Sequence, residues 1–388
     1  MSARRYAVVS ALILCAVALF LVLTPKRQFT GEAQGLRVAD ALRAHPDEGF
    51  ARATEPRRFV FPEDHGPHPG FRTEWWYFTG NLATGDGRRF GYQLTFFRVA
   101  LSPEPVQRTS RWGTDHIITA HFALTDVAGK RFHHAERYGR EALGLAGAGG
   151  RPLRVWLDDW SAVETGNRPW RMHLTAREGE AEIDLTVSAR RPEVLNGEGG
   201  LSRKGGEQGN ASYYYSIPRL ETAGTVTVAG RTYSVSGLSW LDREWSTSAL
   251  GAAQSGWDWF ALQLDDGRDI MFYLLRNRDG SSDPWSSGTL VAADGSYRHL
   301  SRDQVRIDVL DRWPSPATGI RYPSRWRFRI PAEGVDLEIV PRLADQELRT
   351  TVRYWEGAVS VQSRIPGGSA GSGYVELTGY GEGGLSAN

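Results

Sequence analysis

The chain has 388 residues and a formal net charge of +1, and its acidic and basic residues are mixed along its length. No basic block predicts a nucleic-acid partner, and the one cysteine, Cys15, leaves neither a disulfide nor a thiolate metal site for the rest of the chain. Glycine (44 residues) and the aromatic residues (14 Trp, 14 Tyr and 15 Phe) are abundant, which is typical of a turn-rich β protein.

An uninterrupted apolar run covers residues 6–23, with basic residues close to both of its ends. Its length is sufficient to span a bilayer and is long for the apolar core of a signal peptide. No small-x-small cleavage site follows it. We therefore predict that residues 1–27 form a signal or anchor segment and that the protein is exported to the periplasm. We expect residues 6–23 to anchor it in the inner membrane, or the protein to be secreted if the segment is cleaved.

Residues 28–58 are polar and rich in alanine and arginine, and we interpret them as a linker between the membrane and the body of the protein. From Phe59 onward, apolar residues alternate with polar or small ones, as expected of half-buried strands. The alternating sets are Phe90, Tyr92, Leu94 and Phe96; Ile183, Leu185 and Val187; Trp326, Phe328 and Ile330; and Val375 and Leu377. Glycine-containing turn signals occur at 85–87, 266–267 and 279–280. Strands do not alternate with helices, so the sequence predicts an all-β fold.

Histidines and acids near residue 70 are the first candidate site residues. His65 and His68 could share a metal, but they lie in a loop with a proline and their spacing is unspecific, so we predict no metal and no cofactor. The alternative is a buried polar cluster of His65 and Glu74 beneath tryptophans such as Trp76. Its role would be structural or catalytic.

His116 and His121 are five residues apart on a predicted strand, so they face opposite sides of the sheet and at most one of them reaches a given cavity. Farther on, Tyr214 is predicted to point away from Tyr213 and Tyr215, its neighbours on a strand. Tyrosines in this arrangement line either a core, with their hydroxyls at the rim, or the wall of a ligand cavity.

The centre of the chain is unusual because Asp242, Glu244 and Asp258 lie among four tryptophans in the segments 240–245 and 256–260. Carboxylates among aromatic residues are poorly hydrated, which raises their pKa. A raised carboxyl pKa suits a proton donor that works near neutral pH. The alternative is that these acids form ion pairs with neighbouring arginines at a domain joint.

The segment 367–371 matches the nucleophile-elbow pattern of serine hydrolases by letter. That elbow requires a strand-to-helix turn, whereas this segment joins two predicted strands and is better interpreted as a hairpin loop. Zinc-hydrolase, P-loop and dinucleotide motifs do not occur. The sequence therefore disfavours a serine or zinc hydrolase.

The chain also repeats itself. Trp75-Trp76-Tyr77-Phe78 precedes an Asp-Gly-Arg turn at 86–88, and Trp257-Asp258-Trp259-Phe260 precedes another at 266–268. Further matches follow in the same order, with a period above 150 residues, so the pattern indicates a domain duplication and not a solenoid. Antiparallel strands of this number must close or stack to bury their edges, and we predict two β-barrels or strongly bent sandwiches.

Four motifs, at 62–68, 74–82, 240–245 and 256–260, resemble the signature of the lipocalin-like, AttH-type "predicted secreted hydrolase" family, a relative of the carotenoid 1,2-hydratases (hydroxyneurosporene synthases). The resemblance implies two tandem lipocalin-like antiparallel β-barrels, which we assign to residues 59–243 and 244–388. It also implies a lipophilic ligand and often a partnership with an ABC transporter.

The carotenoid hydratases carry an Asp-His-Asn-aromatic stretch before a tryptophan-rich strand. Asp242 and Trp245 match that stretch, while Arg243 and Glu244 replace its His and Asn. The leading hypothesis is that Asp242 protonates a double bond of an isoprenoid-like or lipid molecule and that Glu244 or Asp258 orients the acid or activates water. The expected substrate-binding residues are Trp245, Trp257, Trp259, Tyr214, His65, Glu74, Trp76 and His121. The alternative is a non-catalytic lipid carrier that works with an envelope ABC transporter.

Overall fold

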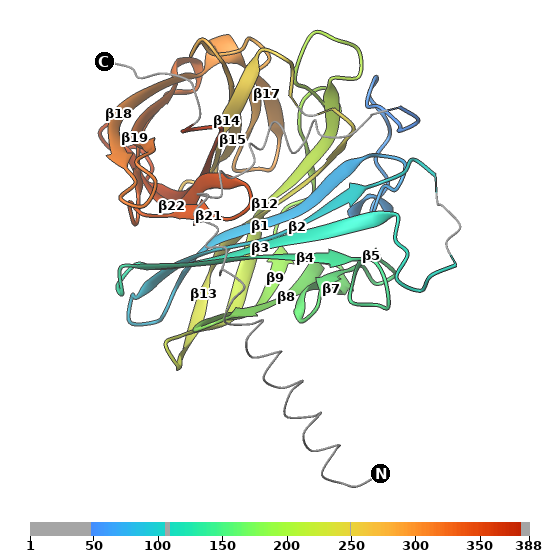
Figure 1. Ribbon diagram of the computed structural model, residues 1–388. Coiled ribbons are helices and arrows are strands. Elements are labelled where there is room, and N and C mark those ends of the chain that lie inside the picture. The colour runs from blue at the N-terminus through green and yellow to red at the C-terminus, as the bar shows by residue number, and fades with distance from the viewer. Residues whose placement is uncertain (1–47, 105–108, 249, 382–388) are drawn as a thin grey trace, which may run out of the picture. The chain divides into compact units, whose positions relative to one another are not determined.

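Antiparallel strands dominate the computed structural model, which describes residues 48–381 except 105–108 and 249 (Figure 1). Helix within these residues is limited to three 3-10 turns, Glu63–His65 (η1), Arg302–Gln304 (η2) and Pro331–Glu333 (η3). None of the helices in this part of the chain has the length and apolar character needed to span a bilayer. The predicted segment at 1–27, and residues 28–47 of the predicted linker, lie outside the described residues. The all-β prediction is confirmed.

The first sheet contains thirteen strands. Eleven of them are neighbours in the order β4-β3-β2-β1-β13-β12-β9-β8-β7-β6-β5, and β10 and β11 pair with β12. The strands are β1 (Thr73–Ala83), β2 (Arg89–Ala100), β3 (His116–Asp126), β4 (Arg131–Arg140), β5 (Ala146–Gly149), β6 (Arg154–Leu157), β7 (Trp160–Asn167), β8 (Trp170–Glu178), β9 (Ala181–Ala189), β10 (Val194–Leu195), β11 (Leu201–Arg203), β12 (Ala211–Val228) and β13 (Arg231–Ser246). Strand β4 contacts β5 and β6 at the other end of this order, so the sheet curls into a barrel-like form around its own core.

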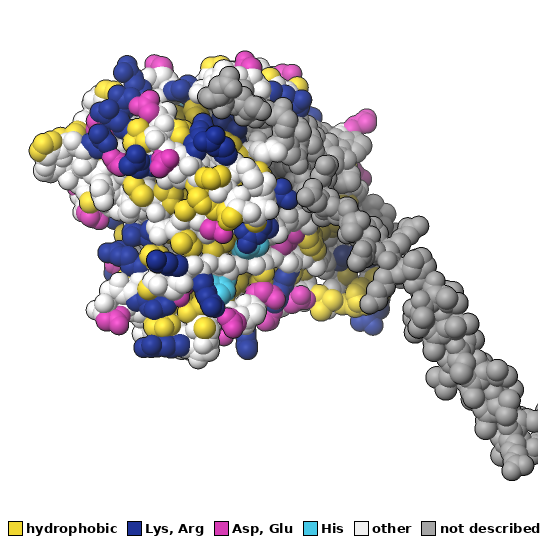
Figure 2. Space-filling model, turned by 60° about the vertical axis from the view of Figure 1, so that its left-hand side comes forward, with side chains coloured by type: hydrophobic (Ala, Val, Ile, Leu, Met, Phe, Trp, Pro, Cys, Tyr) yellow, Lys and Arg dark blue, Asp and Glu magenta, His cyan; other side chains and the backbone are white. Residues whose placement is uncertain are grey.

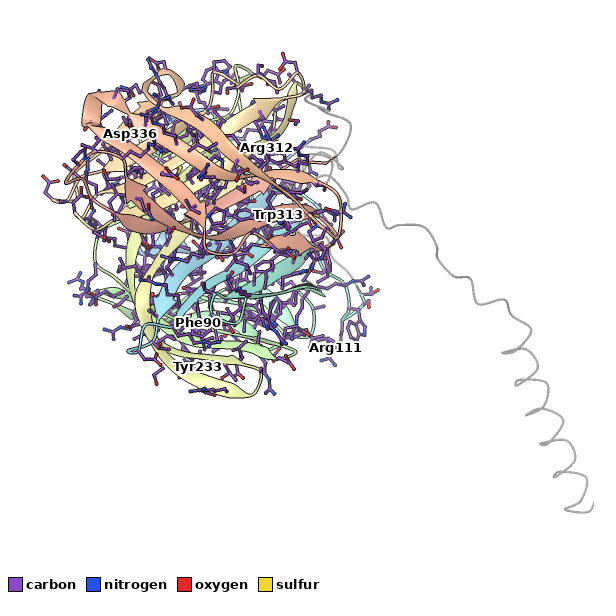
Figure 3. The ribbon with its side chains drawn as sticks, turned by 90° about the vertical axis from the view of Figure 1, so that its left-hand side faces the viewer. Phe90, Arg111, Tyr233, Arg312, Trp313 and Asp336 are labelled. Carbon is purple, nitrogen blue, oxygen red and sulfur yellow. The ribbon has the colours of Figure 1, made fainter. Side chains whose placement is uncertain are left out.

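The second sheet contains ten strands in the order β17-β16-β15-β14-β23-β22-β20-β19-β18, with β21 paired to β22. The strands are β14 (Gln254–Leu264), β15 (Asp269–Asn277), β16 (Ser287–Val291), β17 (Tyr297–Ser301), β18 (Arg306–Pro314), β19 (Arg321–Ile330), β20 (Val335–Pro341), β21 (Glu347–Arg349), β22 (Arg353–Ser363) and β23 (Gly371–Thr378). It has a separate core built around Trp326 and Trp355. Figure 3 shows Trp313 and Asp336 on this sheet, and Phe90 and Tyr233 on the first.

The two sheets follow one plan, in agreement with the predicted duplication. Strand β1 pairs with the next strand, β2, and with the last long strand of its sheet, β13. Strand β14 likewise pairs with β15 and with the last strand, β23. Gly87 and Gly267 occupy the turns after β1 and β14 with φ of 88° and 91°, a backbone region that favours glycine.

The first sheet extends beyond the boundary expected from the sequence. Strand β13 continues to Ser246, which pairs with Thr73 of β1 and Ser212 of β12. Residues 244–246 therefore belong to the first sheet, and the connection between the sheets lies between β13 and β14. The described end of the predicted linker also packs on this sheet, because Ala53 is buried in its core and Tyr213 donates a hydrogen bond to the carbonyl of Glu55.

Aromatic residues from both sheets form a third buried cluster, which we call the seam. Its members include Tyr77, Tyr214 and Trp240 from the first sheet and Trp259, Tyr273 and Tyr374 from the second. Polar contacts join the same surfaces: Asn81 donates to the carbonyl of Gly373 at 2.9 Å, and Gln263 donates to that of Ser239 at 3.0 Å. The tryptophan-rich joint predicted between the two halves is therefore present.

Candidate functional site

The face of the molecule in Figure 2 carries basic and acidic side chains interspersed with hydrophobic ones, and no patch of one sign covers it. Groups capable of chemistry gather instead in a cavity of about 330 Å³ at the seam. Strands β1 to β4, β12 and β13 line it from the first sheet, and β14, β15, β22 and β23 line it from the second. The volume lies in the range of small-molecule sites.

The alternation of side chains along each strand decides which residues reach this cavity. On β1, Trp75 and Tyr77 line the cavity, whereas Trp76 belongs to the core of the first sheet. On β14, Trp257 and Trp259 line it. The cavity therefore lies between the sheets and outside both barrel-like cores.

Asp242 lines the cavity with its carboxyl group almost fully buried. Ser216 Oγ and Trp240 Nε1 donate hydrogen bonds to Oδ1 at 2.5 and 2.7 Å. Tyr214 Oη donates to Oδ2 at 2.5 Å and itself accepts a hydrogen bond from Trp259 Nε1 at 3.1 Å. Three donors from the first sheet thus hold the carboxyl group in one orientation, and Trp259 of the second sheet holds one of these donors, Tyr214.

Burial raises the pKa of Asp242 to about 7, against the lowering effect of its hydrogen bonds to Ser216, Tyr214 and Trp240. No described basic residue forms an ion pair with it. Arg243 instead binds Glu74, and Arg219 binds Asp269. The predicted alternative of an ion pair at Asp242 is absent from the described residues, and a carboxyl group with this pKa is populated in both protonation states near neutral pH.

Glu244 lies two residues farther along β13 and also lines the cavity. Its Oε1 is 3.2 Å from Lys204 Nζ and accepts a hydrogen bond from Ser212. Lys204 Nζ lies 3.7 Å from the ring centroid of Tyr273. This carboxylate is thus neutralised by a lysine, unlike that of Asp242.

Of the expected binding residues, Trp257, Trp259, Tyr214 and His121 line the cavity. His121 Nδ1 is 2.6 Å from Tyr354 Oη, and its Nε2 is 3.0 Å from Glu136 Oε1. The prediction that His116 and His121 face opposite sides agrees with the structure, since His116 pairs with Glu141 instead.

Asp258 is the expected catalytic residue that the structure does not bring to the cavity. It lies on the opposite face of β14 from the two tryptophans, where Arg276 Nε donates to it at 2.8 Å and Tyr380 Oη at 3.0 Å. Burial raises its pKa despite the nearby Arg276. This is the ion pair with an arginine that was the structural alternative for the acids, but it lies within the second sheet and not at the joint between the halves.

Trp245, Trp76 and His65 also lie away from the cavity, in the core of the first sheet or against it. Trp245 stacks on His68 with ring centroids 3.7 Å apart. Trp76 Nε1 donates to the carbonyl of His65 at 2.9 Å, and His65 Nδ1 is 2.6 Å from Tyr215 Oη. These residues hold the loop at η1 against the sheet.

Glu74 borders the cavity, but its carboxylate is fully buried and bound to arginines. Arg98 Nε contacts Oε1, Arg243 Nη2 lies 3.1 Å from Oε2, and the backbone N–H of His68 donates to Oε1 at 3.0 Å. Arg98, His68 and Arg243 together outweigh burial and hold the pKa of Glu74 far below its usual value. Glu74 is therefore a permanent anion, which suits a structural role.

Two acids of the site were not anticipated from the sequence. Glu356 on β22 accepts a hydrogen bond from Tyr77 Oη, and Glu376 on β23 accepts one from Trp257 Nε1 at 3.3 Å. Burial raises the pKa of Glu356 well above its usual value and that of Glu376 to about 8. Glu376 lies between Val375 and Leu377, at a polar position of the alternating pattern, so the local sequence did not mark it as a site residue.

No group of three or more His, Cys, Asp or Glu side chains in the described chain is arranged to hold a metal ion. The cavity therefore offers carboxyl groups, phenols and indoles for its chemistry. Such a set can transfer protons and stabilise a cation.

Comparison with known proteins gives the fold a family context. Residues 52–380 match the model of the family described as AttH-like. No curated protein sequence matches the chain. A solved protein from Nitrosomonas europaea described as an AttH shares 36% sequence identity, with a TM-score of 0.77 and coverage of 86% of this chain and 100% of the other.

Kievitone hydratase from Nectria haematococca is also similar in structure. Its TM-score is 0.64 at 16% sequence identity, and the match covers 85% of this chain and 98% of the hydratase. At this identity the likeness shows a shared fold alone.

Proposed function

The chain belongs to the AttH-like family, and from this premise we propose that it binds a lipophilic, isoprenoid-like or lipid molecule at the seam and hydrates or isomerises one of its double bonds. The observation that carries the proposal is Asp242. It is a buried carboxyl group on the wall of an aromatic cavity, with three hydrogen-bond donors and no ion-pair partner among the described residues.

In the proposed reaction, protonated Asp242 transfers its proton to one carbon of the double bond. The π electrons form the new C–H bond, and the neighbouring carbon becomes a cation. The Asp242 carboxylate that remains is stabilised by the hydroxyl of Ser216 and the indole N–H of Trp240. Water then forms a C–O bond at the cation and returns a proton to Asp242. In an isomerisation, the cation instead loses a proton from an adjacent carbon to Asp242.

The cation needs stabilisation while it exists, and Trp257 and Trp259 line the cavity to provide it through their π faces. Glu244 lies on the same face of β13, where its ion pair with Lys204 holds it in place to orient the acid or the attacking water. Trp245 and Asp258 have no part in this proposal, because their side chains lie away from the cavity.

The alternative proposal is a carrier that holds a lipid in the same cavity and passes it to or from an envelope ABC transporter without turnover. The aromatic lining favours it, since an apolar ligand would be retained there with or without a reaction. Both proposals place the body of the protein in the periplasm, anchored through residues 6–23. A buried acid with no ion pair and a pKa near 7 destabilises the folded protein, and a carrier has no use for it. We therefore favour the enzyme over the carrier.

The test starts from molecules that co-purify with the full chain from its own membranes, identified by native mass spectrometry. Each is incubated with the protein in ¹⁸O-labelled water and in deuterated water. We expect an ¹⁸O-hydroxyl or a new C–D bond to appear with the parent protein, and to decrease by about 10²- to 10⁴-fold in Asp242→Asn.

The matched control is Asp184→Asn, because Asp184 is an exposed carboxylate on β9 that pairs with His173. This variant should keep full turnover. Retention of a bound lipid by the parent protein, with neither label incorporated, would support the carrier in place of the enzyme.

A further inference from the structure

Glu356 and Glu376 form an unusual pair. They occupy directly opposed positions on β22 and β23, and both line the cavity. Two ionised carboxylates directly opposite each other on antiparallel strands would be destabilising, and burial raises the pKa of both, so without a cation they keep their protons at neutral pH. No described basic residue forms an ion pair with either of them.

Glu356 has an unused acceptor as well. Its Oε1 accepts the hydrogen bond from Tyr77, but its Oε2 has no hydrogen-bond partner among the described residues, although the residue is only 1% exposed. A buried oxygen without a partner is costly. In a cavity wall, such an oxygen is available to a group on a ligand.

Most other buried carboxylates of the described chain have basic partners; Asp242 is an exception, and three hydrogen-bond donors hold it instead. These pairs are Glu74 with Arg98 and Arg243, Asp258 with Arg276, Asp269 with Arg191 and Arg219, and Glu244 with Lys204. Buried acids of the described chain are thus mostly held by a base or, at Asp242, by several hydrogen-bond donors. At Glu356 and Glu376 the cationic partner is missing from the protein itself.

The walls around the two glutamates are suited to a cation. Tyr77 and Trp257 donate to the carboxyl groups, and Trp75, Phe97 and Tyr354 line the same cavity. Aromatic faces attract ammonium groups, most strongly where water is excluded. The described chain holds no cluster arranged for a metal ion, so an organic cation fits better.

Building on the proposed binding of a lipophilic molecule, we propose that the ligand carries a basic nitrogen. The structure assigns its ammonium group, protonated or quaternary, to Glu356 and Glu376, and its apolar part to the remaining aromatic walls of the cavity. The ligand class is thus a lipophilic amine or a quaternary ammonium compound.

The test compares two probes of the same shape. Benzyltrimethylammonium carries the cation, and 2,2-dimethylpropylbenzene replaces its nitrogen by carbon. Each is titrated into the full chain in lipid nanodiscs, with empty nanodiscs as the blank, and binding is followed by tryptophan fluorescence. We expect the ammonium probe to bind at least about tenfold more tightly than the neutral one.

The preference for the cation should disappear in the double variant Glu356→Gln/Glu376→Gln. It should persist in Glu338→Gln, a control on β20 whose carboxylate pairs with Arg364 outside the cavity. Melting temperatures check that the variants are folded. If the double variant is unfolded, Glu376→Gln alone replaces it, because the side chain of Glu376 is only partly buried.

Equal or tighter binding of the neutral probe would overturn the inference and leave the proposed lipophilic site intact. The inference would also be wrong if the glutamine variants kept the full preference for the cation. Failure of both probes to bind would count against the proposed binding site as well.

Discussion

Replacing Asp242 by asparagine tests the central residue of the site through stability as well as turnover. Asparagine fits the position, because its amide oxygen can accept the hydrogen bonds of Ser216 and Trp240 that now reach Oδ1. Its amide nitrogen, in the place of Oδ2, can donate to Tyr214 Oη. The substitution thus keeps the shape and the hydrogen bonds from Ser216 and Trp240, reverses the direction of the one with Tyr214, and removes the ionisable proton.

The expected change in stability follows from the raised pKa of Asp242, from 3.8 to about 7 in the folded protein. Between these values the unfolded chain is ionised while the folded protein keeps its proton, so the parent loses stability as the pH rises through this window. Each pKa unit corresponds to about 1.4 kcal/mol. Two units separate pH 5 from the folded pKa, which gives a loss of about 3 kcal/mol between pH 5 and pH 8 that Asp242→Asn does not share.

The assay is urea unfolding of parent and variant at pH 5 and pH 8, followed by tryptophan fluorescence. We expect the difference in free energy of unfolding, variant minus parent, to be about 3 kcal/mol larger at pH 8 than at pH 5. Other titrating groups are common to both proteins and cancel in this comparison. A variant destabilised by several kcal/mol at both pH values would refute the reasoning, because that is the signature of a broken buried ion pair.

Three further predictions follow from the same contacts. Glu74→Gln should lower the free energy of unfolding by about 3–5 kcal/mol, measured by urea unfolding, because two buried arginines lose their anion. Tyr214→Phe removes a hydrogen bond that lowers the pKa of Asp242, so the loss of activity on the alkaline side of the pH–rate profile should move to a higher pH, with turnover otherwise retained. An unchanged profile would show that this hydrogen bond does not control the pKa of the catalytic acid. A periplasm-specific reporter fused after Asn388 should be active, whereas activity of a cytoplasm-specific reporter there would contradict export through residues 6–23.

Much of the fold was accessible from local sequence patterns. The period-two sets such as Phe90 to Phe96 lie on β2, and the Asp-Gly turns follow β1 and β14, because both features depend on neighbouring residues alone. The end of the first sheet was not accessible in this way. Ser246 belongs to β13 only because Thr73 pairs with it across the sheet, and such a contact leaves no local pattern.

The site was predicted only in part, because some of its residues follow from local alternation along a strand and others depend on pairing between strands. Asp242 and Glu244 share a face of β13, and Trp245 lies on the other face because it is an odd number of residues from Asp242. That parity was present in the sequence and argued against Trp245 as a cavity residue, as it did for Asp258 beside Trp257. The two acids that the sequence prediction did not include are a different case. Glu356 and Glu376 lie opposite each other only because of the register of β22 and β23, which no local pattern shows.

The location of the cavity follows from how the two sheets are filled. The first has Trp76, Trp160 and Trp245 in its core, and the second has Trp326 and Trp355, so the barrel-like interiors are occupied by their own side chains. The aromatic residues that face outward would be exposed on a separate half, and they are buried only where the halves meet. Duplication thus provides a site that one half could not form: the first half supplies an acid with a pKa near neutrality, and the second supplies two glutamates that have no cation of their own. A ligand held there contacts both halves at once, so each half constrains the other's chemistry.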